Sequence, residues 1–177
     1  MESFNQLNSQ LVNENVYAIL PDKGGNLLLG TLSALVSFNP EKKSFTTIDK
    51  EKDGTPFTSQ RITILFRDSH KRLWVGGEEG ISVFQQEGIE IEKVPILPES
   101  SVTKTFTNCI YEAANGIIWV GTREGFYCFN EKEKKIKRYT TANGLPNNVV
   151  YGILEDTFGR LWAVSYTHLT LPTIRLV

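Results

Sequence analysis

The chain has 177 residues, enough for one domain, and its formal net charge of −1 gives no overall attraction to nucleic acid or to an anionic membrane. It is 40% hydrophobic and 22% charged, which is ordinary for a globular protein. No run of about 18 apolar residues could cross a bilayer, and residues 1–10 lack the apolar segment of a signal peptide. Either the protein is cytoplasmic or Met1 is not the start of the natural chain.

One short pattern recurs along the chain and contains every tryptophan. It reads Leu73-Trp74-Val75-Gly76 in its fullest form. The spacings from Leu28 to Trp74, then to Trp119 and then to Trp162 are 46, 45 and 43 residues. A fixed period in this range is the sequence signature of a propeller blade or a similar array. The other copies are Leu27-Leu28-Leu29-Gly30, Ile118-Trp119-Val120-Gly121 and Leu161-Trp162-Ala163-Val164.

Other residues keep a fixed distance from the tryptophan. An aspartate stands six residues before it in three copies, with Ala113 as the exception, and a glycine stands three before it, with Lys71 as the exception. Aspartate bonds the following backbone and glycine takes a positive φ, so this spacing predicts a tight turn between two strands. The turn residues are Asp22, Asp68 and Asp156, with Gly25, Gly116 and Gly159.

Each repeat predicts four short strands. The first is rich in Val, Ile, Leu and aromatic residues, and the second carries the tryptophan. The third ends in a charged turn, the fourth is outermost, and a polar link such as residues 141–148 leads to the next repeat. No amphipathic helical stretch of useful length appears. The predicted first strands span 15–20, 61–66, 107–111 and 149–154, the third strands 35–38, 81–84 and 126–129, and the fourth strands 45–48 and 136–139.

Four antiparallel strands in about 45 residues make one blade of a β-propeller, so the sequence predicts an all-β fold. A propeller typically has four to eight blades. Residues 1–163 supply only about three and a half, so we expect a partial propeller with an incomplete ring, as a fragment of a longer protein. The repeat is lost after residue 163, and residues 164–177 are expected to be a non-native tail. The predicted blades span 11–52, 57–98, 102–141 and, in part, 145–163.

The pattern resembles the two-component regulator propeller repeat. The motif of that family runs Gly-Leu-Pro-x-Asn, a Val/Ile strand, Asp-x-x-Gly-x-Leu-Trp-Val/Ile-Gly-Thr, and then Gly-Leu/Ile with a following Phe. Gly144-Leu145-Pro146-Asn147-Asn148 through Trp162 matches the first half, and Trp119-Val120-Gly121-Thr122 through Phe129 matches the second. The resemblance covers residues 7–163. The departures are Leu28 for Trp, Ala113 for Asp and Lys71 for Gly.

The resemblance implies a function. In that family such repeats form the extracytoplasmic sensor of membrane-bound hybrid histidine kinases, many from Bacteroides-like bacteria, that respond to polysaccharide breakdown products. It therefore implies a periplasmic, ligand-sensing segment that detects oligosaccharides and performs no chemistry itself. Its implied partners are further blades and a kinase of the same parent chain. Two alternatives stay open: a propeller enzyme such as a polysaccharide lyase, and a protein-interaction scaffold.

The sequence predicts no catalytic residue, metal site or cofactor. The glycines of residues 76–80 recur at Gly121 and Gly125, so this segment is interpreted as a turn and not as a phosphate loop. The repeated aspartate is interpreted as turn chemistry. Cys109 and Cys128 fall in strand-like runs, and we predict buried free thiols, with a bond between them as the minority alternative.

Residues that differ between repeats are better candidates for binding, because the repeated residues serve the fold. No ligand residue is assigned among them. The turn residue His70 and the basic run 132–138 are interpreted as solvated surface. The loop candidates are Glu78, Glu79, Arg123 and Glu124, and the inter-blade link adds Asn143, Asn147 and Asn148.

Overall fold

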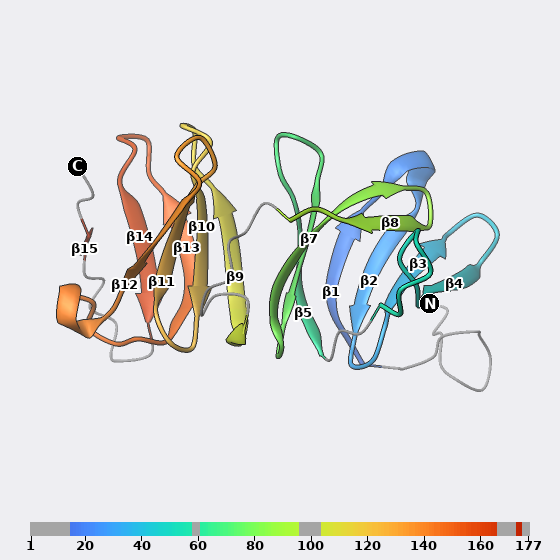
Figure 1. Cartoon of the computed structure of the whole chain (residues 1–177), viewed down its shortest axis with the longest axis horizontal. Coiled ribbons are helices and arrows are strands. Elements are labelled where there is room, and N and C mark those ends of the chain that lie inside the picture. The colour runs from blue at the N-terminus through green and yellow to red at the C-terminus, as the bar shows by residue number, and fades with distance from the viewer. Residues whose placement is uncertain (1–14, 58–60, 96–103, 166–172, 175–177) are drawn as a thin grey trace. The chain divides into compact units, whose positions relative to one another are not determined.

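The regular structure of the described residues consists of strands apart from two three-residue 3-10 turns, η1 (Lys23–Gly25) and η3 (Thr141–Asn143) (Figure 1). The computed structural model describes residues 15–57, 61–95 and 104–165, and the backbone of 173–174. Within these residues no helix is long and apolar enough to span a membrane. The predicted all-β class is confirmed.

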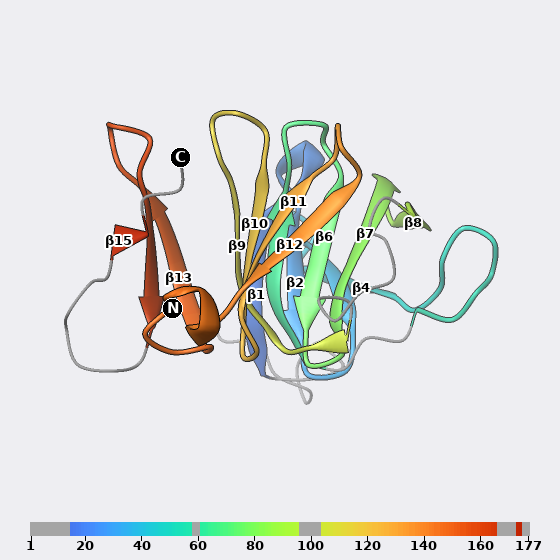
Figure 2. The ribbon, with the colours of Figure 1, turned by 60° about the vertical axis from the view of Figure 1, so that its left-hand side comes forward.

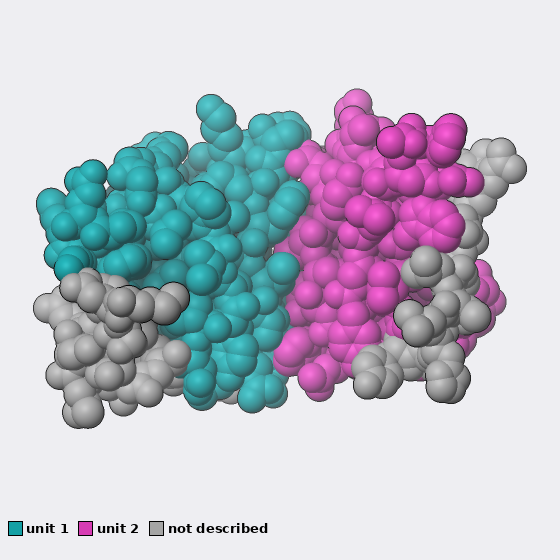
Figure 3. All heavy atoms as spheres, turned by 180° about the vertical axis from the view of Figure 1, so that it is seen from behind, with its two compact units in different colours: residues 1–94 teal, residues 95–177 magenta. Residues whose placement is uncertain are grey.

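Unit 1, residues 1–94, contains two four-stranded antiparallel sheets whose strands follow one another in chain order (Figure 3, teal). Successive strands pair through short turns, as the repeat predicted. The first sheet is formed by β1 (Val16–Pro21), β2 (Leu27–Thr31), β3 (Leu35–Asn39) and β4 (Ser44–Ile48), and the second by β5 (Ile62–Arg67), β6 (Leu73–Gly77), β7 (Gly80–Glu87) and β8 (Glu90–Lys93).

Unit 2, residues 95–177, has one four-stranded and one three-stranded sheet (Figure 2). The strand that carries Trp162 runs on to Ser165, two residues beyond the predicted end of the repeat. Most of the predicted tail lies outside the described residues. The sheets are β9 (Thr107–Glu112), β10 (Ile118–Thr122), β11 (Phe126–Asn130) and β12 (Lys135–Tyr139), then β13 (Val150–Glu155), β14 (Leu161–Ser165) and β15 (Thr173–Ile174).

The repeated tryptophan occupies the same place in each sheet, as predicted. Trp74 and Trp119 are buried, whereas Trp162 is half-buried. The three positions are equivalent because the strand register is the same. In every sheet the residue at this place pairs with the one eight positions earlier: Leu28 with Leu20, Trp74 with Phe66, Trp119 with Tyr111, and Trp162 with Leu154.

The apolar core of each unit lies between its two sheets. In unit 1 the buried cluster joins Leu28 of the first sheet to Leu73 of the second. In unit 2 it joins Trp119 and Phe126, whose rings stack with centroids 4.8 Å apart, to Val150 of the second sheet. Each large apolar side chain removed from water contributes about 1.5–3 kcal/mol. Packing between sheets therefore stabilises both units, and a second buried cluster of Leu29, Ala34, Val36 and Phe45 lies on the first sheet of unit 1.

The glycine two residues after the tryptophan allows the sheets to approach closely. A Cβ atom on Gly30 would lie 2.6 Å from Cγ2 and 2.9 Å from the carbonyl oxygen of Ile62 in the other sheet. A Cβ atom on Gly121 would overlap Sγ of Cys109 in its own sheet, and would lie 2.9 Å from Cγ1 and 3.1 Å from the carbonyl oxygen of Val150 in the other sheet. Ile62 and Val150 both stand twelve residues before the tryptophan of their own repeat. The repeat therefore needs glycine here for packing between sheets.

A buried carboxylate ties the first turn of the second sheet to the indole of the next strand. Asp68 accepts hydrogen bonds from Trp74 Nε1 at 2.8 Å, from Arg72 Nε at 2.7 Å and from the Arg72 backbone N–H at 2.8 Å. Asp68 and Arg72 are buried, and their pairing offsets the cost of removing both charges from water. The aspartate is a turn residue, as predicted, but the role of the arginine was not predicted.

The same network forms at the turn between β13 and β14. Asp156 accepts hydrogen bonds from Trp162 Nε1 at 3.0 Å, Arg160 Nε at 2.6 Å and the Phe158 backbone N–H at 2.9 Å. Burial alone would raise the pKa of Asp156, but the hydrogen bonds from Trp162, Arg160 and Phe158 outweigh it and hold this pKa below its ordinary value. The turn therefore contains an ionised, fully engaged carboxylate.

Two sheets lack one member of this aspartate–tryptophan network, and the member that remains has a different hydrogen-bonding state in each sheet. In the third repeat Ala113 replaces the aspartate, and the buried Trp119 Nε1 has no hydrogen-bond partner. In the first repeat the tryptophan is missing, and Asp22 instead accepts from Arg67 at 3.1 Å and from Gln86 Nε2 at 2.9 Å. Arg67 and Gln86 belong to the second sheet of unit 1. In the repeat that lacks the tryptophan, the aspartate therefore forms hydrogen bonds to the next sheet.

Unit 2 also has a polar contact between its two sheets, made by a glutamate at the position that Arg67 occupies in unit 1. Glu155 Oε2 accepts from the Tyr111 hydroxyl at 3.0 Å and from the Ala114 N–H at 3.3 Å. Glu155 and Arg67 both stand seven residues before the tryptophan of their repeat. In both units, the side chain at this position therefore forms a hydrogen bond with the first hairpin of the preceding sheet.

We expect Gly121→Ala to lower the free energy of unfolding by about 1–3 kcal/mol, because an added methyl overpacks the contacts with Cys109 Sγ in the same sheet and with Val150 in the other sheet. Gly152→Ala is the matched control, since its Cβ would lie 3.7 Å from Val164, an ordinary contact. Urea unfolding measures both variants. Equal stabilities would contradict the packing role of Gly121.

We expect Asp68→Ala to lower the free energy of unfolding by about 3–5 kcal/mol, because it removes the carboxylate that Arg72 and Trp74 share in the core. Asp156→Ala removes the same bonds where the Arg160 side chain is 46% exposed, so its cost should be smaller. Guanidinium unfolding followed by tryptophan fluorescence measures both. A larger loss for Asp156→Ala would show that burial does not set the strength of the network.

Candidate functional site

Two of the predicted loop regions lie at one end of the unit 2 sheets. Because neighbouring strands are antiparallel, the β10–β11 loop and the link from β12 to β13 leave the sheets at the same end. Figure 1 shows this loop and η3 at the lower end of the unit. We call residues 123–125 and 140–149 the unit 2 rim. It carries five of the predicted candidates, Arg123, Glu124, Asn143, Asn147 and Asn148.

The β10–β11 loop presents an exposed arginine and an exposed glutamate on a fixed backbone. The Arg123 guanidinium lies 4.0 Å from the ring centroid of Phe106. Thr122 holds the loop, because its Oγ1 accepts from the Glu124 N–H at 3.0 Å and donates to the Gly125 carbonyl at 2.9 Å. The Arg138 Nε donates to the Glu124 carbonyl at 3.0 Å. Charge, an aromatic face and a braced backbone therefore occur together.

The three asparagines of the link hold its backbone through their side-chain oxygens. Asn143 Oδ1 accepts from the Thr140 N–H at 3.1 Å, and Asn147 Oδ1 accepts from the Val149 N–H at 2.8 Å. Asn148 Oδ1 accepts from the Thr141 N–H at 2.8 Å, which closes the link on itself. Asparagine is favoured for such local bonds in turns. The structure therefore assigns these residues a structural task that the sequence did not predict.

The other two candidates are in unit 1. Glu78 and Glu79 form the exposed turn between β6 and β7, so the predicted turn is confirmed at these two residues, while Gly76, Gly77 and Gly80 lie in the flanking strands. Glu78 Oε2 lies 4.0 Å from Arg61 Nε, and both side chains are more than 40% exposed. An ion pair of this exposure contributes little to stability.

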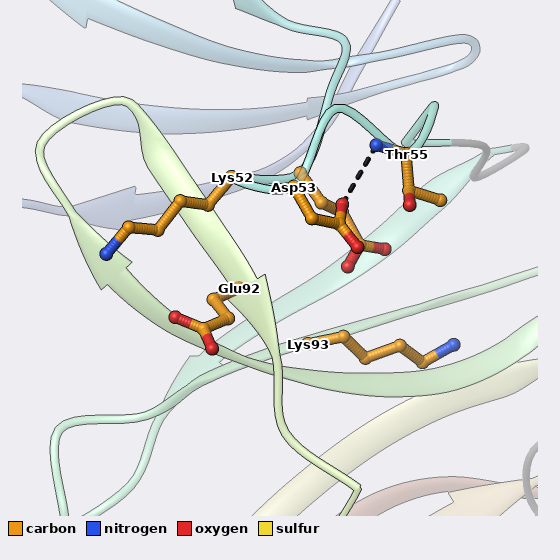
Figure 4. Close-up of a pocket in the computed structure, with 6 residues that line it drawn as sticks. Lys52, Asp53, Thr55, Glu92 and Lys93 are labelled. Atoms are coloured by element: carbon orange, nitrogen blue, oxygen red, sulfur yellow. Dashed lines mark hydrogen bonds between the residues drawn. The ribbon is translucent and has the colours of Figure 1, made fainter.

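A hollow of about 700 Å³ lies beside β8 in unit 1, and its described lining residues are all charged or polar (Figure 4). The Lys52 N–H donates to the Ile91 carbonyl at 2.7 Å and holds the link from β4 against β8. Asp53 Oδ1 accepts from the Thr55 N–H at 2.9 Å, and hydrogen bonds from Thr55 lower the pKa of Asp53. The lining residues are Glu51, Lys52, Asp53, Thr55, Glu92 and Lys93.

This hollow was not predicted, because it depends on how the link from β4 to β5 packs against β8. Figure 4 shows the Lys52 and Lys93 side chains extending in different directions. Mixed charges suit a small polar ligand. The unit 2 rim, which combines polar groups with Phe106, suits a sugar better.

The cysteines and the histidine have no part in either region. Cys109 and Cys128 are free, as predicted, and each is half-buried. Burial raises the pKa of Cys109 to about 12 and also raises that of Cys128. His70 is exposed in its turn, with Nδ1 3.5 Å from an Arg72 nitrogen. Across the described residues, no set of three or more His, Cys, Asp and Glu side chains is arranged to hold a metal ion.

The sheets and the rim define a repeat protein built of propeller blades. Residues 100–124 and 144–167 match the two component regulator propeller family. The predicted resemblance is confirmed for these two segments of unit 2.

The chain is also similar to parts of longer proteins. It is 29% identical over 168 residues to histidine kinase P4 of Formosa agariphila, covering 90% of this chain and 12% of the kinase. It matches the extracellular domain of the hybrid two component system BT3049 of B. thetaiotaomicron with a TM-score of 0.71 and 21% identity, covering 92% of this chain and 22% of that domain.

Virginiamycin B lyase from Staphylococcus aureus has the same fold, with a TM-score of 0.60 and 18% identity over 90% of this chain and 52% of the lyase. The likeness to both solved structures shows the propeller fold. The chain spans about an eighth of the kinase and about a fifth of the extracellular domain.

We expect Asn148→Ala to loosen the link, because Thr141 N–H loses its acceptor. The expected cost is about 0.5–1.5 kcal/mol, with faster hydrogen exchange at Thr141. Asn148→Asp is the matched variant, since it keeps an acceptor oxygen and should exchange like the parent. Equal hydrogen exchange at the Thr141 amide in Asn148→Ala and in the parent would contradict a structural role for this asparagine.

Proposed function

We propose that this chain is a ligand-sensing propeller segment of a hybrid two-component histidine kinase and that it senses oligosaccharides in the periplasm. The family match and the similarity to a histidine kinase support the regulator class. The fold shared with an extracellular domain of a two component system supports the location. The parent chain would supply further blades and the kinase.

The observation that carries the proposal is the division of tasks within unit 2. The repeated residues Gly121, Asp156 and Trp162 are engaged in packing between sheets and within turns. Residues that vary between repeats, such as Arg123 and Glu124, lie exposed at the rim on a braced loop. A rigid scaffold that presents variable loops at one end is the usual arrangement of a binding protein.

The chemistry of the rim fits a sugar. A guanidinium donates to hydroxyl or carboxylate oxygens, a carboxylate accepts from hydroxyls, and an aromatic face packs on the apolar face of a sugar ring. Arg123 stacks on one face of the Phe106 ring, and the neighbouring Glu124 carboxylate lies 3.9 Å from Arg138. These side chains supply the three groups on one loop and the residue that it packs against. Binding would produce a signal by favouring the arrangement of the parent domains that binds the sugar more tightly, since a ligand shifts only states that it binds differently.

Calorimetric titration of the full chain with neutral and acidic oligosaccharides tests the proposal. We expect saturable binding, and we expect Arg123→Ala to weaken it about tenfold or more, equivalent to about 1.4 kcal/mol. Lys132→Ala is the matched control, because it removes an exposed charge from the turn between β11 and β12, at the other end of the sheet.

Chromatography of the same mixtures looks for products. Turnover of any glycan would contradict the sensor proposal and would favour a propeller enzyme. Binding that Arg123→Ala leaves unchanged would move the site away from the rim, and the absence of binding to any glycan would favour a protein-interaction scaffold.

A further inference from the structure

Two positions of the repeat lie side by side where the loop after the tryptophan strand begins. One stands thirteen residues before the tryptophan of its repeat, and the other stands four residues after it. They are neighbours because the antiparallel pairs that adjoin them have the same register in both units. Those pairs are Ile62 with Gly77 in unit 1 and Thr107 with Thr122 in unit 2.

In unit 1 these two positions hold opposite charges. Arg61 stands thirteen residues before Trp74, and Glu78 stands four residues after it. Arg61 Nε lies 4.0 Å from Glu78 Oε2. The guanidinium therefore has a carboxylate of its own chain beside it, and the pair carries no net charge.

In unit 2 the same two positions hold Phe106 and Arg123, so the carboxylate is missing. The Arg123 guanidinium lies 4.0 Å from the ring centroid of Phe106, and the Arg123 backbone N–H donates to the Phe106 carbonyl at 3.1 Å. Within the part of the chain that the structure describes, Arg123 forms no ion pair. A guanidinium that stacks on a ring keeps its N–H groups in its own plane, where their fork matches both oxygens of a carboxylate.

The adjoining glutamate is already engaged by a second cation. Glu124 Oε2 lies 3.9 Å from an Arg138 nitrogen, and Arg138 Nε donates to the Glu124 carbonyl at 3.0 Å. The link, residues 140–149, contains no charged residue. Since Arg138 offsets Glu124, the uncompensated charge at the rim is the positive charge of Arg123.

The link offers more hydrogen-bond donors than acceptors. The Oδ1 atoms of Asn143, Asn147 and Asn148 each accept a backbone N–H. The amide of an asparagine has two further donors on Nδ2, and the described residues give them no acceptor. A rim with a free cation and spare N–H donors favours a ligand that carries acceptor oxygens and negative charge.

We propose that the ligand of the unit 2 rim is an acidic oligosaccharide, and that the Arg123 guanidinium, stacked on Phe106, binds the carboxylate of a uronic acid. This inference rests on the proposed function, because it specifies the class of sugar that the same site takes. The two oxygens of the carboxylate accept from the guanidinium fork. A neutral sugar has an uncharged hydroxymethyl group at that place and lacks this charge-assisted contact.

Calorimetric titration of the full chain with uronic acid trimers, each compared with its carboxyl-reduced form, tests this. Reduction replaces only the carboxylate by a hydroxymethyl group, so stereochemistry and linkage are matched. The trimers are those of galacturonic, glucuronic, mannuronic and guluronic acid. We expect at least one acid to bind about tenfold or more tightly than its reduced form, equivalent to about 1.4 kcal/mol. Added salt should weaken the binding of the acid and leave that of the reduced form unchanged.

Variants at the stacked pair are compared by the ratio of the two dissociation constants, reduced form over acid. Arg123→Gln should lower this ratio to about one, because the cation is lost from an exposed loop residue that the fold does not need. Phe106→Glu should do the same, since it places a carboxylate beside Arg123 as Glu78 lies beside Arg61. Phe106→Gln is its matched control, which loses the ring without adding charge and should keep a higher ratio. Lys132→Ala removes a distant charge and should leave the ratio unchanged.

The outcomes separate this inference from the proposed function. Equal binding of an acid and its reduced form, or binding of reduced forms alone, would overturn the acidic class and leave a sugar site. A ratio that Arg123→Gln leaves unchanged would overturn the assignment of the carboxylate to Arg123. Absence of binding by every trimer would also overturn the inference, and the wider glycan series would then decide whether the rim takes any sugar.

Discussion

The structure depends on one close approach between neighbouring sheets. The first strand of a following sheet passes so near the second strand of the preceding one that only glycine fits, at Gly30 opposite Ile62 and at Gly121 opposite Val150. This contact lets large apolar side chains on both sheets meet in one core, which stabilises each unit. Gly30, Gly76 and Gly121 recur at this position in three of the four copies, and at Gly30 and Gly121 an added methyl would overlap the neighbouring sheet.

The buried carboxylate network is the second constraint, and its exceptions show how the partners depend on one another. Where aspartate, arginine and tryptophan all occur, as at Asp68, they bind one another within a hairpin. Where the tryptophan is absent, Asp22 binds Arg67 of the next sheet instead. A buried or half-buried carboxylate needs hydrogen-bond donors, so it takes those that the local sequence leaves within reach.

The residues that neither the core nor the turns require are the ones available for binding a ligand. The repeated residues are engaged by the core and by the turns, so specificity can reside only in residues that vary. In unit 2 the varied residue Arg123 stacks on Phe106 and is followed by the exposed Glu124, on a loop that Thr122 holds in place. The asparagines of the adjoining link keep the backbone in shape. In the proposed function, binding and scaffold are therefore supplied by different residues of the same repeats.

The sequence alone determined the repeat, the strand order, the equivalent tryptophans and the turn role of the aspartates, because these are local patterns of period and turn chemistry. It could not reveal the role of Arg72, the hollow beside β8 or the contact of Arg123 with Phe106. Those depend on which residues of different strands or links come into contact. It named Asn148 as a binding candidate, whereas its hydrogen bond to Thr141 N–H emerges only once the link closes on itself. Local pattern fixes the blade, and packing between strands and sheets decides what each side chain does, because contact distances are set in three dimensions.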